Sequence, residues 1–315
     1  MEAVRCQGLR KRYGAVQALD GLSLTVHQGT VFGFLGPNGA GKTTTIRILT
    51  GLARPDDGSA WVCGAEVVND AHQVAHRIGY LPEEPAFYGW MTPREFLDYV
   101  GQTFGMARAE RQARTEELLH LVGLAAAADR RIAGFSRGMR QRLGLAQALV
   151  NRPEVLFLDE PASALDPSGR REVLQLIEGL RGQATVFMST HILADVERVC
   201  DTVGIIARGR MVAEERREEL LARYAVPAFE LEAEETSLAR MREWAGRLAQ
   251  EPWVQTVSQD GPSVRVVVSD LQRAKRELLS SALSSGLVLT RYEMVRPSLE
   301  DVFLQLVGER AARHE

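Results

Sequence analysis

A glycine-rich segment between an apolar run and a helix-like stretch constrains this chain more than any other feature. The apolar run covers residues 30–35 and the helix-like stretch covers 43–52. Between the run and the first helical turn stand Gly36, Pro37, Asn38, Gly39, Ala40, Gly41, Lys42, Thr43 and Thr44. Glycines allow a turn so tight that successive backbone N–H groups converge, and a helix start adds partial positive charge. The segment predicts a nucleotide phosphate site in which Lys42 reaches the β- and γ-phosphates and Thr43 ligates Mg²⁺.

The composition of the chain limits its number of domains, its partners and its cellular compartment. The chain has 315 residues, of which 45% are hydrophobic and 25% charged, as expected for one large globular domain and a smaller one. A net charge of −3 favours no nucleic-acid partner. Cys6, Cys63 and Cys200 lack metal-like spacing, a pattern typical of reduced thiols in the cytosol. The sequence has neither a signal-peptide pattern nor an uncharged apolar run of about 18 residues, so we expect a chain without a membrane span.

The order of strand-like and helix-like segments predicts an α/β fold for the first part of the chain. Alternating segments near 3–12 and 19–27 indicate antiparallel strands. Residues 92–150 have mainly helical periodicity and begin with a capping box, Thr92 to Glu95. Strands and helices alternate again from 155 to 207, which predicts a buried parallel sheet covered by helices.

A shift in composition near residues 224–227 predicts a second, smaller domain. The expected elements are a strand (229–233), a helix (238–250), a hairpin (254–257 with 264–268), a helix (271–284), a strand (288–294) and a last helix (298–307). The order β-α-β-β-α-β predicts a ferredoxin-like α+β domain. We therefore expect a nucleotide-binding domain over 1–223, with its helical insert at about 92–150, and an accessory domain over 224–315.

Two acidic residues follow the apolar run 155–158. Taken alone, Asp159 and Glu160 could be solvated acids at the end of a strand. Beside a phosphate loop, however, a carboxylate at the tip of a buried strand is placed to hold Mg²⁺ through its water shell. We therefore expect Asp159 to take that role and Glu160 to polarise the water that attacks the phosphate.

Residues 135–142 read Phe-Ser-Arg-Gly-Met-Arg-Gln-Arg and resemble the signature motif of ATP-binding cassette (ABC) ATPases. The resemblance extends over residues 1 to about 220, and it implies an ABC ATPase fold with a mixed sheet, an antiparallel β subdomain and a helical subdomain. It also implies that Tyr13 stacks on adenine, that Asp166 couples two active sites and that His191 contacts the γ-phosphate. In this family the signature residues bind ATP across a dimer, and here they are Ser136, Arg137, Gly138 and Met139. We expect an ATP-dependent homodimer, which is simpler than a dimer with a sister ATPase.

The chain departs from the family pattern at three of these positions. Arg137 and Met139 replace the first glycine and the glutamine of the signature, while Ser136 and Gly138 are kept. Glu83, in Tyr-Leu-Pro-Glu-Glu, stands where the family normally has a glutamine that contacts the metal. A carboxylate can still ligate Mg²⁺ through oxygen, but it adds negative charge near the phosphates. We expect Glu83 to alter metal preference or coupling strength.

The segment 292–303 resembles the tail of cassette ATPases that serve ABC-2 type exporters. The resemblance implies an ATP-hydrolysing subunit on the cytoplasmic face of the membrane, held there by a separate permease that it powers. The alternative is a soluble cassette ATPase that acts on ribosomes or DNA. The chain has no heptad run, no second cassette and no basic excess, which favours the transporter. For the second domain, a packing or dimer-stabilising role and a regulatory role both remain open.

Overall fold

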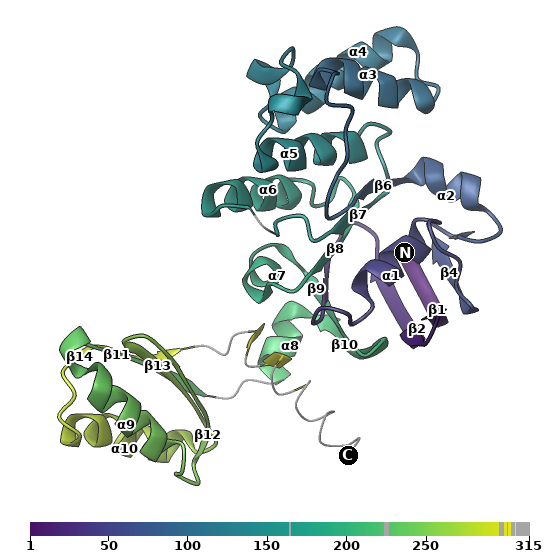
Figure 1. The fold of residues 1–315 in the computed structure, drawn as a ribbon. Coiled ribbons are helices and arrows are strands. Elements are labelled where there is room, and N and C mark those ends of the chain that lie inside the picture. The colour runs from purple at the N-terminus through teal and green to yellow at the C-terminus, as the bar shows by residue number, and fades with distance from the viewer. Residues whose placement is uncertain (164, 224–226, 296–298, 301, 304–305, 307–315) are drawn as a thin grey trace. The chain divides into compact units, whose positions relative to one another are not determined.

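The computed structural model describes residues 1–163, 165–223, 227–295, 299–300, 302–303 and 306 (Figure 1). The chain forms two compact units, Met1–Arg217 and Glu218–Glu315. The division falls at the start of helix α8 (Arg217–Arg223), whereas the sequence placed it after that helix. Each unit has a core of its own and is described separately.

A six-stranded sheet forms the centre of the first unit, in the order β10-β9-β3-β8-β7-β6. All neighbouring strands in it are parallel except β10, which runs antiparallel to β9. The strands are β3 (Val31–Leu35), β6 (Ile78–Leu81), β7 (Val155–Asp159), β8 (Thr185–Thr190), β9 (Thr202–Ala207) and β10 (Arg210–Arg216). Every residue of β3, β7 and β8 is buried, which explains their continuous apolar runs. Because these three strands are parallel, the segments that follow them emerge at one edge of the sheet.

An antiparallel sheet in the order β2-β1-β4-β5 packs on the same core. Its strands are β1 (Glu2–Tyr13), β2 (Val16–His27), β4 (Asp57–Val62) and β5 (Ala65–Glu66). Helix α1 (Lys42–Leu49) contributes Ile46 and Ile48 to this core, beside Leu9 and Leu22 of the sheet. The short helix α2 (Ala71–Arg77) leads back to β6 of the central sheet. The expected antiparallel subdomain is confirmed.

The predicted helical insert is also confirmed, and its first helix begins where the sequence indicated. It contains α3 (Pro93–Thr103), α4 (Arg108–Leu121) and α5 (Arg137–Ala148), with single 3₁₀ turns at Ala125–Ala127 and Ile132–Gly134. The Thr92 hydroxyl accepts from the Glu95 N–H (3.2 Å), and the Glu95 carboxylate accepts from the Thr92 N–H (2.9 Å). Helices α6 (Pro167–Gly179) and α7 (Leu193–Val199) complete the unit. Within the described part of the chain, no helix combines the length and the apolarity needed to cross a membrane.

The second unit has the predicted ferredoxin-like order of elements after α8. These are β11 (Ala228–Ala233), a 3₁₀ turn (Glu235–Ser237), α9 (Leu238–Leu248), β12 (Val254–Asp260), β13 (Ser263–Val268), α10 (Leu271–Ser284) and β14 (Leu289–Val295). The sheet is antiparallel throughout, in the order β12-β13-β11-β14, and its core side chains lie beneath the two helices. Trp244 of α9 is buried and donates from Nε1 to the Ser281 Oγ of α10 (3.0 Å). The expected helix 298–307 and its capping box, Ser298 to Asp301, lie largely outside the described residues.

Candidate active site

The glycine-rich segment and the ends of the neighbouring strands enclose a cavity of about 460 Å³. It is lined by Val16, Ala18, Asn38, Gly39, Ala40, Gly41, Lys42, Thr43, Thr44, Glu83, Glu160 and His191. Gly39 and Gly41 have left-handed backbones, with φ of 78° and 109°. A Cβ at Gly41 would also stand 2.6 Å from the backbone oxygen of Ala18, so only glycine fits there. The loop thus brings backbone amides and the start of α1 to the cavity wall, as a phosphate cradle requires.

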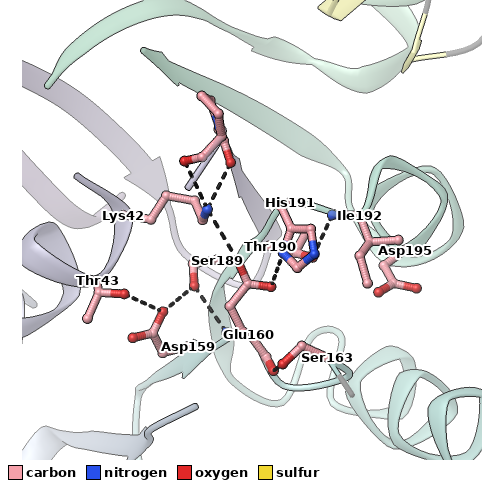
Figure 2. A network of polar contacts seen from close by, with 12 residues as sticks. Lys42, Thr43, Asp159, Glu160, Ser163, Ser189, Thr190, His191, Ile192 and Asp195 are labelled. Carbon is pink, nitrogen blue, oxygen red and sulfur yellow. Dashed lines mark hydrogen bonds and ion pairs between the residues drawn. The ribbon is translucent and has the colours of Figure 1, made fainter. Parts of the chain in front are cut away.

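Lys42 is nearly buried, with 6% of its side chain exposed, and its ammonium group faces the cavity (Figure 2). Nζ donates to the backbone oxygens of Gly36 (2.8 Å) and Pro37 (3.4 Å) and lies 3.3 Å from Oε1 of Glu160. A buried ammonium without a counter-charge is costly, and Glu160 provides one. These contacts hold Lys42 at the loop while leaving it beside the space that phosphates would fill.

Asp159, at the end of β7, is buried beneath the start of α1. Its Oδ1 accepts from the hydroxyls of Ser189 (2.5 Å) and Thr43 (3.3 Å). Figure 2 shows these three side chains converging. Hydroxyl and carboxylate oxygens are the hard donors that Mg²⁺ prefers, and magnesium sites usually take one or two protein ligands plus phosphates. Thr43 and Asp159 therefore fit a magnesium site completed by a nucleotide.

Glu160 has an unusual backbone and a fully engaged side chain. Its φ is 49°, a left-handed conformation that is uncommon for a residue other than glycine. Its N–H donates to the backbone oxygen and the Oγ of Ser189, both at 3.1 Å. Its Oε2 lies 2.9 Å from Nδ1 of His191, and only 7% of the Glu160 side chain is exposed. The turned backbone aims the carboxylate into the cavity, where a general base would be needed.

Two predicted nucleotide contacts lie away from the cavity lining. Tyr13 ends β1 and is 45% exposed, with the Lys11 ammonium 5.4 Å from its ring centre. Its register partner Val16 does line the cavity, so Tyr13 stands near the rim. Asp166 caps α6 by accepting from the Gly169 N–H (3.3 Å). Asp166 therefore has a local structural role, whatever its role in coupling.

The signature segment also lies apart from the chain's own cavity. Ser136 caps α5 by accepting from the Met139 N–H (3.2 Å). Of the described residues that line the cavity, none belongs to 136–139. A Cβ at Gly138 would meet no atom within 4 Å, so packing within the chain does not require glycine there. The chain's own cavity therefore includes neither Ser136 nor Gly138 in its lining.

Glu83 lies in the loop after β6, is exposed, and lines the cavity. It also borders a second cavity, together with Arg137 of the signature segment. Two positions at which the chain departs from the family pattern thus meet at one place.

Ser189, which was not predicted as a site residue, links Asp159 and Glu160. Its hydroxyl donates to Asp159 and accepts from the Glu160 N–H, and the residue is fully buried. Asp159 and Ser189 are register partners in the parallel pairing of β7 with β8. The only signal in the sequence is a hydroxyl residue two positions before His191, which cannot reveal the register.

Comparison with known proteins identifies the family. Residues 19–163 match the family described as ABC transporter, and 216–307 match the family described as ATP-binding protein DrrA1-3-like, C-terminal domain. An uncharacterised ABC transporter ATP-binding protein of Bacillus subtilis, YxlF, is 40% identical over 96% of this chain and 98% of its own length. This chain belongs to the ATP-binding subunits of ABC transporters.

Other relatives place the subunit among exporters. The daunorubicin resistance ATP-binding protein DrrA3 of Streptomyces coeruleorubidus is 36% identical over 98% of this chain and 96% of its own length. The bacitracin transport ATP-binding protein BcrA of Bacillus licheniformis is 36% identical over 97% of each chain. These relatives correspond to the ABC-2 type group that the tail sequence indicated. They give no support to the ribosome or DNA alternative.

Solved structures agree with the fold of the first unit. The ATP-binding subunit of an ABC transporter superposes with a TM-score of 0.64 and 29% identity, over 70% of this chain and 93% of that chain. The ADP conformation of another ATP-binding cassette gives a TM-score of 0.62 and 26% identity, over 70% and 92%. The subunit is therefore an ATPase of the ABC transporter type.

Proposed function

We propose that the subunit binds ATP and Mg²⁺ in the cavity at the strand ends. It then hydrolyses the bond between the β- and γ-phosphates, with Glu160 as general base. One observation carries this assignment: Lys42, Asp159, Glu160 and His191 converge on a glycine-rich cradle through contacts of 2.5 to 3.3 Å. Such convergence is what positioning and charge stabilisation of a transferring phosphoryl group require.

The residues divide the work as follows. The backbone N–H groups of 39–44 and the ammonium of Lys42 hold phosphate oxygens, so Lys42 exchanges its contact with Glu160 for one with phosphate. Glu160, released from Lys42 but still beside His191, accepts a proton from the attacking water. Thr43 and Asp159 would hold Mg²⁺, which would supply positive charge to offset that of the phosphates. Tyr13 at the rim stacks on adenine.

The dimer follows from where the signature segment lies. Ser136 caps the start of α5, and the open space beside Gly138 allows a phosphate to approach the backbone closely. The chain's own cavity is lined by other residues, which supports a phosphate bound by a second copy as the one that reaches Ser136 and Gly138. ATP then lies between two chains, and hydrolysis lets them separate.

The permease partner fits an aromatic cluster on the helical insert. Tyr88, Trp90 and Tyr99 are 52%, 65% and 44% exposed, and their rings form one group with centres 6.0 and 6.2 Å apart. Exposed aromatic clusters commonly mark protein interfaces. Tyr88 and Trp90 follow β6 in the same loop as Glu83, which lines the nucleotide cavity. Binding there holds the subunit on the cytoplasmic face of the membrane.

Affinity capture tests the proposal in one step. Tagged Glu160→Gln protein is recovered from detergent-solubilised membranes with ATP and Mg²⁺, beside a variant that also carries Tyr88→Ser and Trp90→Ser. We expect one multi-spanning membrane protein in fixed stoichiometry with the first protein and not with the second. Recovery of ribosomal or DNA-bound proteins, with no membrane partner, would contradict the transporter function. Equal recovery by both variants would contradict the docking surface alone.

A further inference from the structure

Lys11 lies against the ring of Tyr13 at the end of β1. Its ammonium group stands over the ring, 5.4 Å from the ring centre. Lysine side chains at protein surfaces are mostly exposed, yet only 16% of the Lys11 side chain is exposed, whereas Tyr13 itself is 45% exposed. A cation at this distance from a ring centre is attracted by the negative face of the ring. Lys11 therefore covers one face of Tyr13, while much of the ring remains open to a ligand.

Asp56 fixes Lys11 in this position. One oxygen of its carboxylate, Oδ1, accepts from Nζ of Lys11 (2.8 Å), and the other, Oδ2, accepts from the Arg12 N–H (2.6 Å). The Asp56 N–H donates to the backbone oxygen of Arg10 (2.8 Å). Both oxygens of one carboxylate and its own backbone are thus bound to the last residues of β1 before Tyr13.

These contacts lie where β1 extends past its pairing with β4. The register of the two strands ends at the pair Arg10 and Asp57, whereas β1 continues to Tyr13, opposite Val16 of β2. The Arg12 N–H lies beyond that last pair, and it finds its acceptor in the carboxylate of Asp56. Hydrogen bonds to an ionised acceptor are stronger than those between neutral groups. Asp56 therefore steadies the strand end that carries Tyr13.

We propose that Lys11 and Asp56 are positioning residues for the adenine base. Asp56 fixes Lys11, and Lys11 holds the Tyr13 ring so that its opposite face is presented to the base. The inference rests on the proposed function, in which Tyr13 stacks on adenine. A ring without this support would lose side-chain freedom when the base binds, and that loss weakens binding.

The same contacts connect the two ends of the nucleotide site. Asp56 belongs to the segment 50–56, which follows α1 and leads into β4. Helix α1 begins at Lys42, in the phosphate loop. The segment that leaves the phosphate-binding helix therefore also holds the residue that supports the adenine-stacking ring.

Binding of ATP and of inorganic tripolyphosphate, both with Mg²⁺, separates the base from the phosphates. We expect Lys11→Met and Asp56→Asn each to raise the dissociation constant for ATP about fivefold, because the ring loses its support. The dissociation constant for tripolyphosphate, which has no base, should change by less than about twofold. In steady-state assays the loss should appear in KM and not in kcat. Lys11→Arg keeps a cation over the ring and should bind ATP within about twofold of the parent.

Asp57→Asn is the matched control. Asp57 is the next residue along the chain, is also exposed, and its Oδ1 accepts from the Gly58 N–H (2.9 Å). This substitution removes the same charge one position away from the contact with Lys11, and both dissociation constants should keep their parental values.

A double-mutant cycle with Tyr13→Leu shows whether Lys11 acts through the ring. In that background Lys11→Met should change ATP binding by less than about twofold. Equal effects in the two backgrounds, or equal weakening of tripolyphosphate, would show that the ammonium acts on phosphate and would overturn the inference. Tighter ATP binding by Lys11→Met would overturn it as well, because Lys11 would then compete with the base. A parent that binds no ATP would instead overturn the proposed function, and this inference with it.

Discussion

Single residues decide whether the end of β7 is a catalytic site or merely a strand capped by solvated acids. Solvated acids would be exposed and unconstrained, yet Asp159 and Glu160 are both buried and held by named partners. The left-handed backbone of Glu160 costs on the order of 1–3 kcal/mol. The contacts to Ser189, Lys42 and His191 compensate for that cost. Strain of this kind is typical of functional sites.

Glu160→Gln separates binding from hydrolysis. The amide keeps the shape of the side chain but cannot accept the proton, so we expect ATP binding to persist and kcat to fall by about 10²- to 10⁴-fold. Glu154→Gln, just before the start of the same strand and exposed to solvent, is the control and should leave kcat unchanged. The two variants are compared by steady-state ATPase assays and by equilibrium ATP binding. Hydrolysis at the parental rate by Glu160→Gln would show that another group is the base.

Ser189→Ala tests the link between the two acids. The substitution removes the donor to Asp159 and one acceptor for the Glu160 N–H, which we expect to lower the free energy of unfolding by about 1–3 kcal/mol. We also expect kcat to fall about tenfold and the Mg²⁺ concentration for half-maximal rate to rise. Ser189→Thr keeps the hydroxyl and should restore both kinetic quantities. If Ser189→Ala loses stability but keeps the parental Mg²⁺ dependence, the hydroxyl does not position the metal site.

The role of Ser189 could not be predicted, although its neighbours could. Lys42, Thr43, Asp159 and Glu160 stand in local patterns whose chemistry is legible from residue type and spacing. Ser189 acts through its pairing with Asp159 across two strands that are distant in the sequence. Register depends on the hydrophobic pattern of both strands, and here every residue of both strands is buried, so a single serine does not reveal its partner.

Among the elements, helix α5 has the clearest division between structural and functional requirements. Ser136 has a structural role within the chain, because its hydroxyl caps the helix. Packing within the chain does not require glycine at position 138, since a Cβ there would meet open space. A substitution at Gly138 should therefore leave the fold intact. Its effect on activity then reports only on a group, such as a phosphate, that approaches α5 from outside the chain.

Gly138→Ala is expected to leave the free energy of unfolding unchanged or raise it by about 0.5–1 kcal/mol, because alanine favours helix over glycine. The added methyl group would nevertheless block the approach of a phosphate, so the ATPase rate should fall about tenfold or more. Gly179→Ala, in the last turn of α6 and equally free of neighbours, is the matched control. Chemical unfolding and ATPase assays give both readouts. Parental activity in Gly138→Ala would remove the signature segment from the proposed mechanism.

The elements themselves were largely legible in the sequence, while the boundary between the units was not. Continuous apolar runs marked β3 and β7 because those strands are buried on both faces. Alternation and the capping box at Thr92 marked the antiparallel strands and α3. Helix α8 has a sequence that is ordinary for an amphipathic helix, and the division into compact units places all of it but Arg217 in the second unit.

On the scale of the whole molecule, each unit is held by its own core and the three cysteines belong to the first. Burial raises the pKa of the Cys6 and Cys200 thiols far above their ordinary value. Burial, with Glu154 nearby, raises the pKa of Cys63 to about 12. Thiolates are the reactive form, so all three cysteines should be inert near neutral pH.

Thiol labelling of the folded protein tests whether the three cysteines are unreactive. At pH 8 we expect slow labelling of all three cysteines, and rapid labelling of all three once the chain is unfolded in denaturant. Raising the pH toward 12 should increase labelling first at Cys63, because its pKa is the lowest and it is only half-buried. Rapid labelling of Cys6 or Cys200 in the folded protein at pH 8 would contradict the described core.

The central claim is that one chain's cavity is completed by the signature segment of a second chain. Light scattering on purified Glu160→Gln protein measures this directly, with and without ATP and Mg²⁺, while bound nucleotide is quantified in the same sample. We predict a mass near 34.8 kDa without nucleotide and twice that value with it. A single-chain mass with ATP stoichiometrically bound would contradict the account.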